Sequence, residues 1–125
     1  MQEIKEKLNT DEQYASIAHK WEGDMRIVIE PDDKLKEPLW LYFDLWHGKC
    51  RDAYIEAQSS TINPAFILKT SYENIVKILS GEVGVMQALM TRMLGLRGNM
   101  VVMMRNVPTV LDFVRCCKEV TQIWI

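Results

Sequence analysis

The chain has 125 residues, of which 48% are apolar and 26% charged, a balance typical of one folded domain over residues 1–125. Its formal net charge of −2 provides no long-range field for nucleic acid or an anionic membrane, so we expect no nucleic acid partner. The charged start is unlike a signal peptide, and no apolar run reaches the ~20 residues that span a bilayer, which predicts a soluble, cytoplasmic protein.

The first predicted helix begins at residues 10–13, where Thr-Asp-Glu-Gln has the spacing of a capping box. Apolar residues follow at helical intervals: Tyr14, Ile17, Ala18 and Trp21. Gly23 is expected to end this helix. Residues 1–9 are expected either to extend it or to fray.

The pattern then changes to the period of β-strands. Strands are predicted over residues 25–30 and 39–46, with a hairpin turn at 47–49 leading into a third strand. Residues 65–69 form a fourth apolar run. Successive strands with short turns favour a largely antiparallel sheet.

From residue 70 the period is helical again. A second capping box at residues 70–73 opens a helix that Gly81 ends, and residues 82–94 carry a broad apolar stripe. Residues 95–98 leave room for a short edge strand. Asn99 is expected to cap a short helix through Arg105, and Pro108 to open the last one. Strands followed by helices predict an α+β domain with the helices on one face of the sheet.

Motifs of catalysis and metal binding are missing from the sequence. It contains no glycine-rich phosphate loop, His-Glu-x-x-His, Cys-x-x-Cys or nucleophile elbow. His47 and Cys50 could supply two zinc ligands, but a zinc site needs three or four, so we expect no metal and no cofactor. The adjacent Cys116 and Cys117 would make a strained disulfide, which favours reduced thiols. A small enzyme with Cys50 as nucleophile and His47 as base stays open as an alternative.

Methionine is concentrated in one region. Six of the eight methionines lie within nineteen residues: Met86, Met90, Met93, Met100, Met103 and Met104. This flexible, polarisable side chain suits a surface that accommodates an apolar guest, although it also fills irregular cores. Three arginines of the same region, Arg92, Arg97 and Arg105, could hold a carboxylate or phosphate head group, or form a solvated helix face.

From about Trp21 to Val120 the chain resembles the sterol carrier protein (type two) lipid-transfer domain family. The resemblance is most specific in residues 64–81, Pro-Ala-Phe-Ile-Leu-Lys-Thr-Ser-Tyr-Glu-Asn-Ile-Val-Lys-Ile-Leu-Ser-Gly, and continues in residues 86–99 and in the hairpin of 44–50. It implies a five-stranded mixed sheet, an apolar tunnel between sheet and helices, and non-catalytic binding of a fatty acid, fatty acyl-CoA, phospholipid or sterol. Many relatives have Gly-Lys where this chain has Gly81-Glu82, and the segment after Pro108 exceeds the family minimum.

The resemblance carries over to apolar positions and to no catalytic ones. The expected floor of the tunnel is the sheet face with Ile27, Ile29, Leu41, Phe43 and Ile55. The expected roof consists of Met86, Leu89, Met90, Met93, Met100, Met103 and Met104, with Leu111 nearby. The opposite sheet face carries aromatic rings and is a candidate homodimer interface, unless a terminal segment covers it: Trp40, Tyr42, Trp46 and Tyr54.

Other functions remain open from the residues alone. The methionines could form a groove for an apolar partner helix, in a protein-interaction module. The chain could also be an accessory subunit that presents a lipid to an enzyme. A lipid carrier would in addition make transient contact with membranes.

Overall fold

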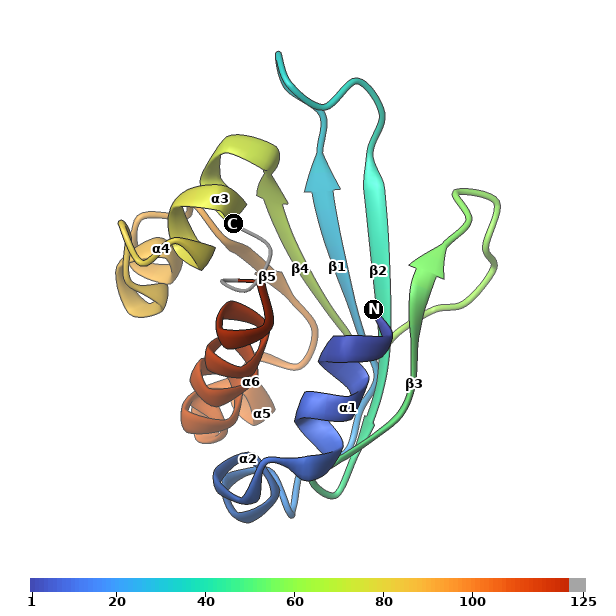
Figure 1. The fold of residues 1–125 in the computed structure, drawn as a ribbon, viewed down its shortest axis with the longest axis vertical. Helices are drawn as coiled ribbons and strands as arrows, with labels where there is room; N and C mark the ends of the chain where they lie inside the picture. The colour runs from blue at the N-terminus through green and yellow to red at the C-terminus, as the bar shows by residue number, and fades with distance from the viewer. Residues whose placement is uncertain (122–125) are drawn as a thin grey trace.

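The computed structural model describes residues 1–121 and places helices on one face of a five-stranded sheet (Figure 1). In chain order its elements are α1 (Gln2–Thr10), α2 (Glu12–Ile17), β1 (Met25–Glu30), β2 (Leu39–Trp46), β3 (Lys49–Glu56), β4 (Phe66–Ser71), α3 (Tyr72–Leu79), α4 (Val85–Met90), β5 (Gly95–Arg97), α5 (Met100–Arg105) and α6 (Val107–Thr121). The predicted α+β class is therefore confirmed.

The sheet has the strand order β3-β2-β1-β4-β5. Neighbouring strands pair antiparallel except for β1 and β4, which run parallel with Met25 opposite Phe66. This pairing requires the chain to return from the end of β3 to the starting end of β1. Residues 57–65 make that connection, and the carbonyl of Ile62 accepts a hydrogen bond from Arg26 on the way. The sheet is mixed, as expected.

The β2–β3 hairpin turns at the predicted residues. His47 and Gly48 both have positive φ, 48° and 78°, the backbone combination that joins twisted antiparallel strands in two residues. A side chain at Gly48 would also meet the carbonyl oxygen of Ala15 at 2.9 Å, so α2 packs directly on this turn. Glycine is therefore required there for two independent reasons.

The N-terminal residues form a helix of their own, and the expectation that residues 1–9 extend the next helix or fray is wrong. Leu8 is completely buried, and the Asn9 side chain bonds both the backbone N–H and the carbonyl of Cys50. The second helix starts at an Asp11 cap and ends at Ile17, well before Gly23. The burial of Leu8 and the hydrogen bonds of Asn9 to β3 thus stop α1 from fraying.

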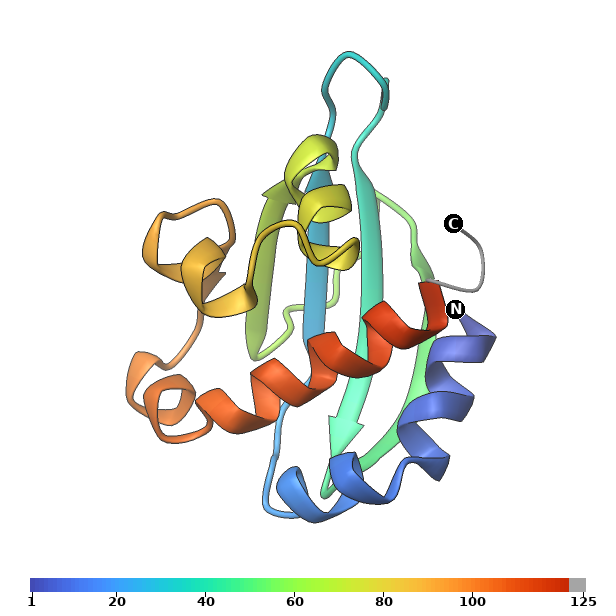
Figure 2. The same ribbon diagram turned by 60° about the vertical axis from the view of Figure 1, so that its left-hand side comes forward.

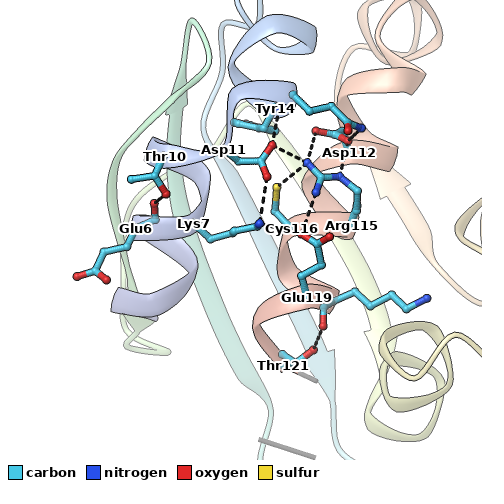
Figure 3. Close-up of polar contacts among 12 residues, drawn as sticks. Glu6, Lys7, Thr10, Asp11, Tyr14, Asp112, Arg115, Cys116, Glu119 and Thr121 are labelled. Atoms are coloured by element: carbon cyan, nitrogen blue, oxygen red, sulfur yellow. Dashed lines mark hydrogen bonds and ion pairs between the residues drawn. The ribbon is translucent and has the colours of Figure 1, made fainter. Parts of the chain in front are cut away.

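Polar contacts join α1 and α2 to the last helix (Figure 3). The Arg115 guanidinium of α6 donates to Asp11 at 2.6 Å, to Asp112 at 2.7 Å and to Glu119 at 2.8 Å. Lys7 adds ion pairs to Asp11 and Glu119. These contacts hold the N-terminal helices beside α6, more than a hundred residues away in sequence.

The last helix, α6, crosses the helix-covered face of the sheet (Figure 2). Phe113 of α6 packs edge-on against Phe43 of β2, with ring centroids 5.0 Å apart, and both side chains are buried. These rings fill the space between β2 and α6 at the centre of the sheet.

The opposite sheet face carries the predicted aromatic side chains. The rings of Tyr42 and Tyr54 pack at a tilt of 39° with centroids 5.1 Å apart, and the Arg26 guanidinium lies 4.2 Å from the ring centre of Trp40. The terminal helices lie on the other side of the sheet, so the alternative that a terminal segment covers these rings is wrong for residues 1–121. A homodimer interface on this face, which also carries Trp46, stays a prediction.

Candidate functional site: a methionine-lined cavity at the sheet edge

A cavity of about 660 Å³ opens beside the edge strand β5. Its walls come from the β4–β5 edge, from α4 and α5, and from the first turn of α6. The lining residues are Lys69, Met86, Leu89, Met90, Arg92, Leu94, Gly95, Leu96, Arg97, Met100, Met103, Met104, Val107 and Val110. A mostly apolar lining with few cationic groups is typical of a ligand site of this size.

Short helices shape the cavity because local signals end them after six residues each. Asn99 caps α5 by accepting hydrogen bonds from the N–H groups of Val101 and Val102. Helix α4 ends at Met90, and Arg92 just beyond it has a φ of 61°, which turns the chain back toward β5. The expected helix over residues 82–94 is thus much shorter in the structure.

Contacts with β4 and the residues before it hold both ends of β5, the strand that forms one wall of the cavity. The buried Thr70 hydroxyl of β4 donates to the Met93 carbonyl at 2.9 Å, just before β5 begins. At the other end of β5, Gly98 has a φ of 134° and lies so close to Phe66 and Ala65 that a Cβ would meet them at 2.5 Å and 2.7 Å. The edge strand is therefore held at both ends, and the cavity wall with it.

Four of the clustered methionines line the cavity with exposed side chains: Met86, Met90, Met100 and Met104. Met90 is 78% exposed and Met104 70% exposed, whereas Met103 is buried. Large apolar side chains at such exposure are costly in water unless a ligand, a membrane or another chain covers them. The sequence predicted methionines at an apolar cavity, and the structure adds that this cavity lies at the β5 edge of the sheet.

Most of the predicted roof residues and two of the head-group candidates line the cavity together: Met86, Leu89, Met90, Met100, Met103, Met104, Arg92 and Arg97. Three further candidates lie elsewhere. Met93 borders a shallow hollow above β4, and Leu111 lines a separate hollow between α3, α4 and α6. Arg105 is exposed at the end of α5 and does not reach the cavity lining.

The predicted floor residues do not border the cavity, and this part of the prediction is corrected by the structure. Ile27, Ile29 and Phe43 are buried in the core, where Phe43 packs against Phe113 of α6, and Leu41 packs against that core. Ile55 lies on the same sheet face but near the end of the edge strand β3, where it is 62% exposed. The cavity is at the opposite edge of the sheet, because α6 already covers the centre.

Six lining residues were not among the predicted site residues: Lys69, Leu94, Gly95, Leu96, Val107 and Val110. Leu96 and Gly95 belong to a three-residue strand, and their alternation was too short to predict a face. Val110 has the same helical spacing as other buried residues of α6, so nothing distinguished it from core. Only the approach of α6 to β5 places these side chains at one cavity.

The nucleophile alternative is not supported by the geometry. His47 lies 2.6 Å from Glu22 through its Nε2, whereas the Cys50 thiol donates to the backbone of Asp52. Burial raises the pKa of Cys50 to about 11, so its reactive thiolate form is rare at neutral pH. Burial also raises the pKa of Cys116 to about 11.

Asp11, Asp112 and Cys116 have potential metal-ligand atoms within 4.8 Å of one another. Both carboxylates already accept hydrogen bonds from the Arg115 guanidinium, which supplies the positive charge at this point. A metal ion would have to compete with that group. The trio is therefore explained as part of the contact between α2 and α6.

Comparison with known proteins identifies the family. The model of the SCP-2 sterol transfer family matches residues 1–110. This chain belongs to that family. The match covers the two N-terminal helices, which the resemblance seen in the sequence did not include, and confirms the relationship seen in the strands and the capped helix. No curated protein matches this chain at a significant level.

Solved structures show the same SCP-2 architecture. A crystal structure of sterol carrier protein 2 is 26% identical with a TM-score of 0.85, covering 94% of this chain and 92% of that one. A conserved hypothetical protein from Thermus thermophilus is 27% identical with a TM-score of 0.81, covering 95% and 84%. Palmitated SCP2L2 from Aedes aegypti is 14% identical with a TM-score of 0.56, covering 91% and 93%, and shares the fold.

Within residues 1–121, no helix of this SCP-2 domain has the length and apolar character needed to cross a bilayer.

Proposed function

We propose that this chain binds one long-chain lipid in the methionine-lined cavity and transfers it without catalysing a reaction. Membership of the SCP-2 sterol transfer family supports lipid binding as the activity. The observation that carries the choice of site is the cavity of about 660 Å³ beside β5, which has room for an apolar chain and opens between exposed methionines. The expected ligand classes remain fatty acids, fatty acyl-CoA, phospholipids and sterols.

The burial of methylenes in such a site is of the same size as the cost of association. Burying each methylene contributes about 0.8 kcal/mol, so ten methylenes contribute roughly 8 kcal/mol against an association cost of about 4–15 kcal/mol. Longer chains are therefore retained more strongly than short ones. Methionine rotamers adapt to different chains, which favours a broad ligand range over a single lipid.

An acidic head group is the expected polar end of the ligand. Arg92 and Arg97 both line the cavity, and neither forms an ion pair or side-chain hydrogen bond within residues 1–121. A guanidinium binds carboxylate or phosphate oxygens through two parallel hydrogen bonds, which a sterol hydroxyl cannot use fully. The Aedes aegypti protein is described as palmitated, so a fatty acid is the first ligand to test.

The absence of catalysis is part of the proposal. Among the cavity-lining residues there is no histidine, cysteine, aspartate, glutamate or serine. General acid–base and nucleophilic catalysis at neutral pH draw mainly on these side chains. Use of the groove for a partner helix is less well supported, because the matching family is defined by lipid transfer.

Native mass spectrometry of the freshly purified protein, followed by organic extraction, tests the proposal. We expect a non-covalent adduct of a few hundred daltons that is released as a lipid. A matched pair of variants then locates the site. Leu89→Trp should fill the cavity and remove the adduct, whereas Val76→Trp, at an exposed position on α3 outside the cavity, should keep it. A protein that never carries or takes up lipid would overturn the proposal.

A further inference from the structure

The segment between Glu82 and Asp112 has an unusual charge composition. It contains three arginines, Arg92, Arg97 and Arg105, and no acidic residue at all. The other 12 basic residues (15 less these three) and all 17 acidic residues lie outside it, which leaves a net charge of −5 on the rest of the chain. The overall charge of −2 therefore conceals a chain with one positively charged segment.

The fold keeps this segment together on one side of the molecule. It includes α4, β5, α5 and the start of α6, which lie together on the left-hand side of the ribbon in Figure 2. The positively charged segment is therefore separated from the acidic residues in space as well as in sequence. The positive charge and the opening of the cavity occupy the same side.

The arginines of this side differ from the other arginines of the protein in their partners. Arg26, Arg51 and Arg115 each bind a carboxylate within the chain. Within residues 1–121, no ion pair or side-chain hydrogen bond involves the three arginines of the 83–111 segment, and all three are exposed. Their charge is available to an external anion.

Exposed apolar side chains accompany this charge. They belong to α4 and α5 and are Met86, Met90, Met100, Val101 and Met104, with exposed fractions of 45%, 78%, 50%, 59% and 70%. Unbranched methionines can enter the apolar boundary of a bilayer and adjust to its irregular surface. Arginines beside them would meet lipid phosphates at the level of the head groups.

From these observations we infer that the surface formed by α4, β5 and α5 docks on the surface of an anionic lipid bilayer. The methionines enter the apolar boundary, the arginines contact the lipid phosphates, and the cavity opens toward the membrane. A bilayer matches this surface better than a protein groove does, because it supplies both an apolar layer and a dense array of phosphates. The inference goes beyond lipid binding in solution and does not depend on the identity of the bound lipid.

Two positions allow docking to be tested separately from ligand binding. Arg105 and Val101 belong to the exposed surface but do not line the cavity. Each has a matched control on β3: Lys49 is an exposed cation, and Ile55 is 62% exposed, close to the 59% of Val101. The four variants are Arg105→Gln against Lys49→Gln, and Val101→Asp against Ile55→Asp.

Co-flotation with unilamellar vesicles measures the docking. We expect the protein to bind vesicles of equal parts phosphatidylcholine and phosphatidylglycerol, and to bind pure phosphatidylcholine much less. Arg105→Gln should weaken binding about fivefold, the ratio that corresponds to about 1 kcal/mol for one cation at a charged surface. Val101→Asp should weaken it at least as much, and both β3 controls should bind like the unmodified protein.

Binding of a fluorescent fatty acid in vesicle-free solution distinguishes this inference from the proposed function. Arg105→Gln and Val101→Asp should leave that binding unchanged. Equal flotation of all variants, or equal binding to neutral and anionic vesicles, would overturn the docking surface while leaving lipid binding intact. Sedimentation that shows a dimer dissociated by Val101→Asp but not by Ile55→Asp would also overturn it, because a second copy would then cover the surface.

Discussion

Arg115 on α6 donates a hydrogen bond from its Nη2 to Oδ1 of Asp11, the capping residue of α2, at 2.6 Å across 104 positions of sequence. The same Asp11 oxygen accepts from the backbone N–H of Tyr14. One carboxylate therefore caps a helix and joins the first and last parts of the chain. This contact determines how the N-terminal helices sit on the domain.

Replacing this carboxylate should destabilise the protein in a pH-dependent manner. Asp11→Ala removes a helix cap and a charge-assisted hydrogen bond, and we expect it to lower the free energy of unfolding by about 2 kcal/mol at pH 7. Urea denaturation followed by circular dichroism measures this loss. Asp33→Ala, at an exposed turn position, is the control and should change the free energy by less than about 0.5 kcal/mol.

The sign of the pH dependence follows from the same contact. Arg115 and the N–H of Tyr14 lower the pKa of Asp11 below its ordinary value of 3.8, so the folded state favours the ionised carboxylate. The stabilisation is complete above the pKa of the unfolded chain and is lost as the pH falls below about 4. The difference between the unmodified protein and Asp11→Ala should therefore shrink on acidification, and a constant difference down to pH 2 would contradict this account.

Breaking the buried ion pair on the aromatic sheet face should be costly. Arg26 donates two hydrogen bonds to Glu56, at 2.7 Å and 2.8 Å, and both residues are buried. Glu56→Gln leaves the guanidinium buried without its counter-charge, and we expect a loss of about 3 kcal/mol in denaturant unfolding. Glu30→Gln is the comparison: it breaks the half-exposed ion pair between Glu30 Oε1 and Lys69 Nζ, which are 3.8 Å apart, and should cost less than about 1 kcal/mol.

The double variant Arg26→Met with Glu56→Leu distinguishes the contribution of the ion pair to stability from the cost of leaving one buried charge unpaired. Its loss should be smaller than the sum of the two single losses, since no buried charge remains. Strict additivity would indicate that the two side chains act independently.

Glycine at position 98 should be required for the cavity wall. In Gly98→Ala the new methyl group meets Phe66 and the Ala65 carbonyl at a positive φ, and we expect a loss of about 2 kcal/mol and weaker lipid retention. Thermal unfolding and native mass spectrometry measure the two effects. Gly84→Ala is the matched control, because a Cβ there meets nothing within 4 Å. Equal behaviour of the two variants would show that β5 tolerates displacement.

The buried thiols should be unreactive in the folded protein. Burial raises the pKa of Cys50 and of Cys116 to about 11 and raises that of Cys117 as well, so little thiolate forms at pH 8. We expect intact-mass measurements to show no alkylation by iodoacetamide under native conditions, and one added group on each of the three cysteines in urea. Rapid native labelling of Cys50 alone would revive the hypothesis of a nucleophile.

The capping boxes show how far local sequence reaches. Both were predicted to begin at a threonine, Thr10 and Thr70, and in both cases the next residue, Asp11 or Ser71, is the actual cap. Thr70 is unavailable because it belongs to β4 and its hydroxyl bonds the Met93 carbonyl. Local spacing therefore located each helix start to within one residue, and a contact from another element selected the capping side chain.

The sequence by itself determined the strand positions, the helix-covered sheet and the concentration of methionines, because these depend on side-chain period and composition. Only the tertiary structure decided that the cavity lies beside β5. The expected floor around Phe43 is filled by Phe113 of α6, and the parallel pairing of β1 with β4 moves the methionine-rich segment to the far edge of the sheet. Both follow from long-range packing of whole elements, which no local pattern encodes.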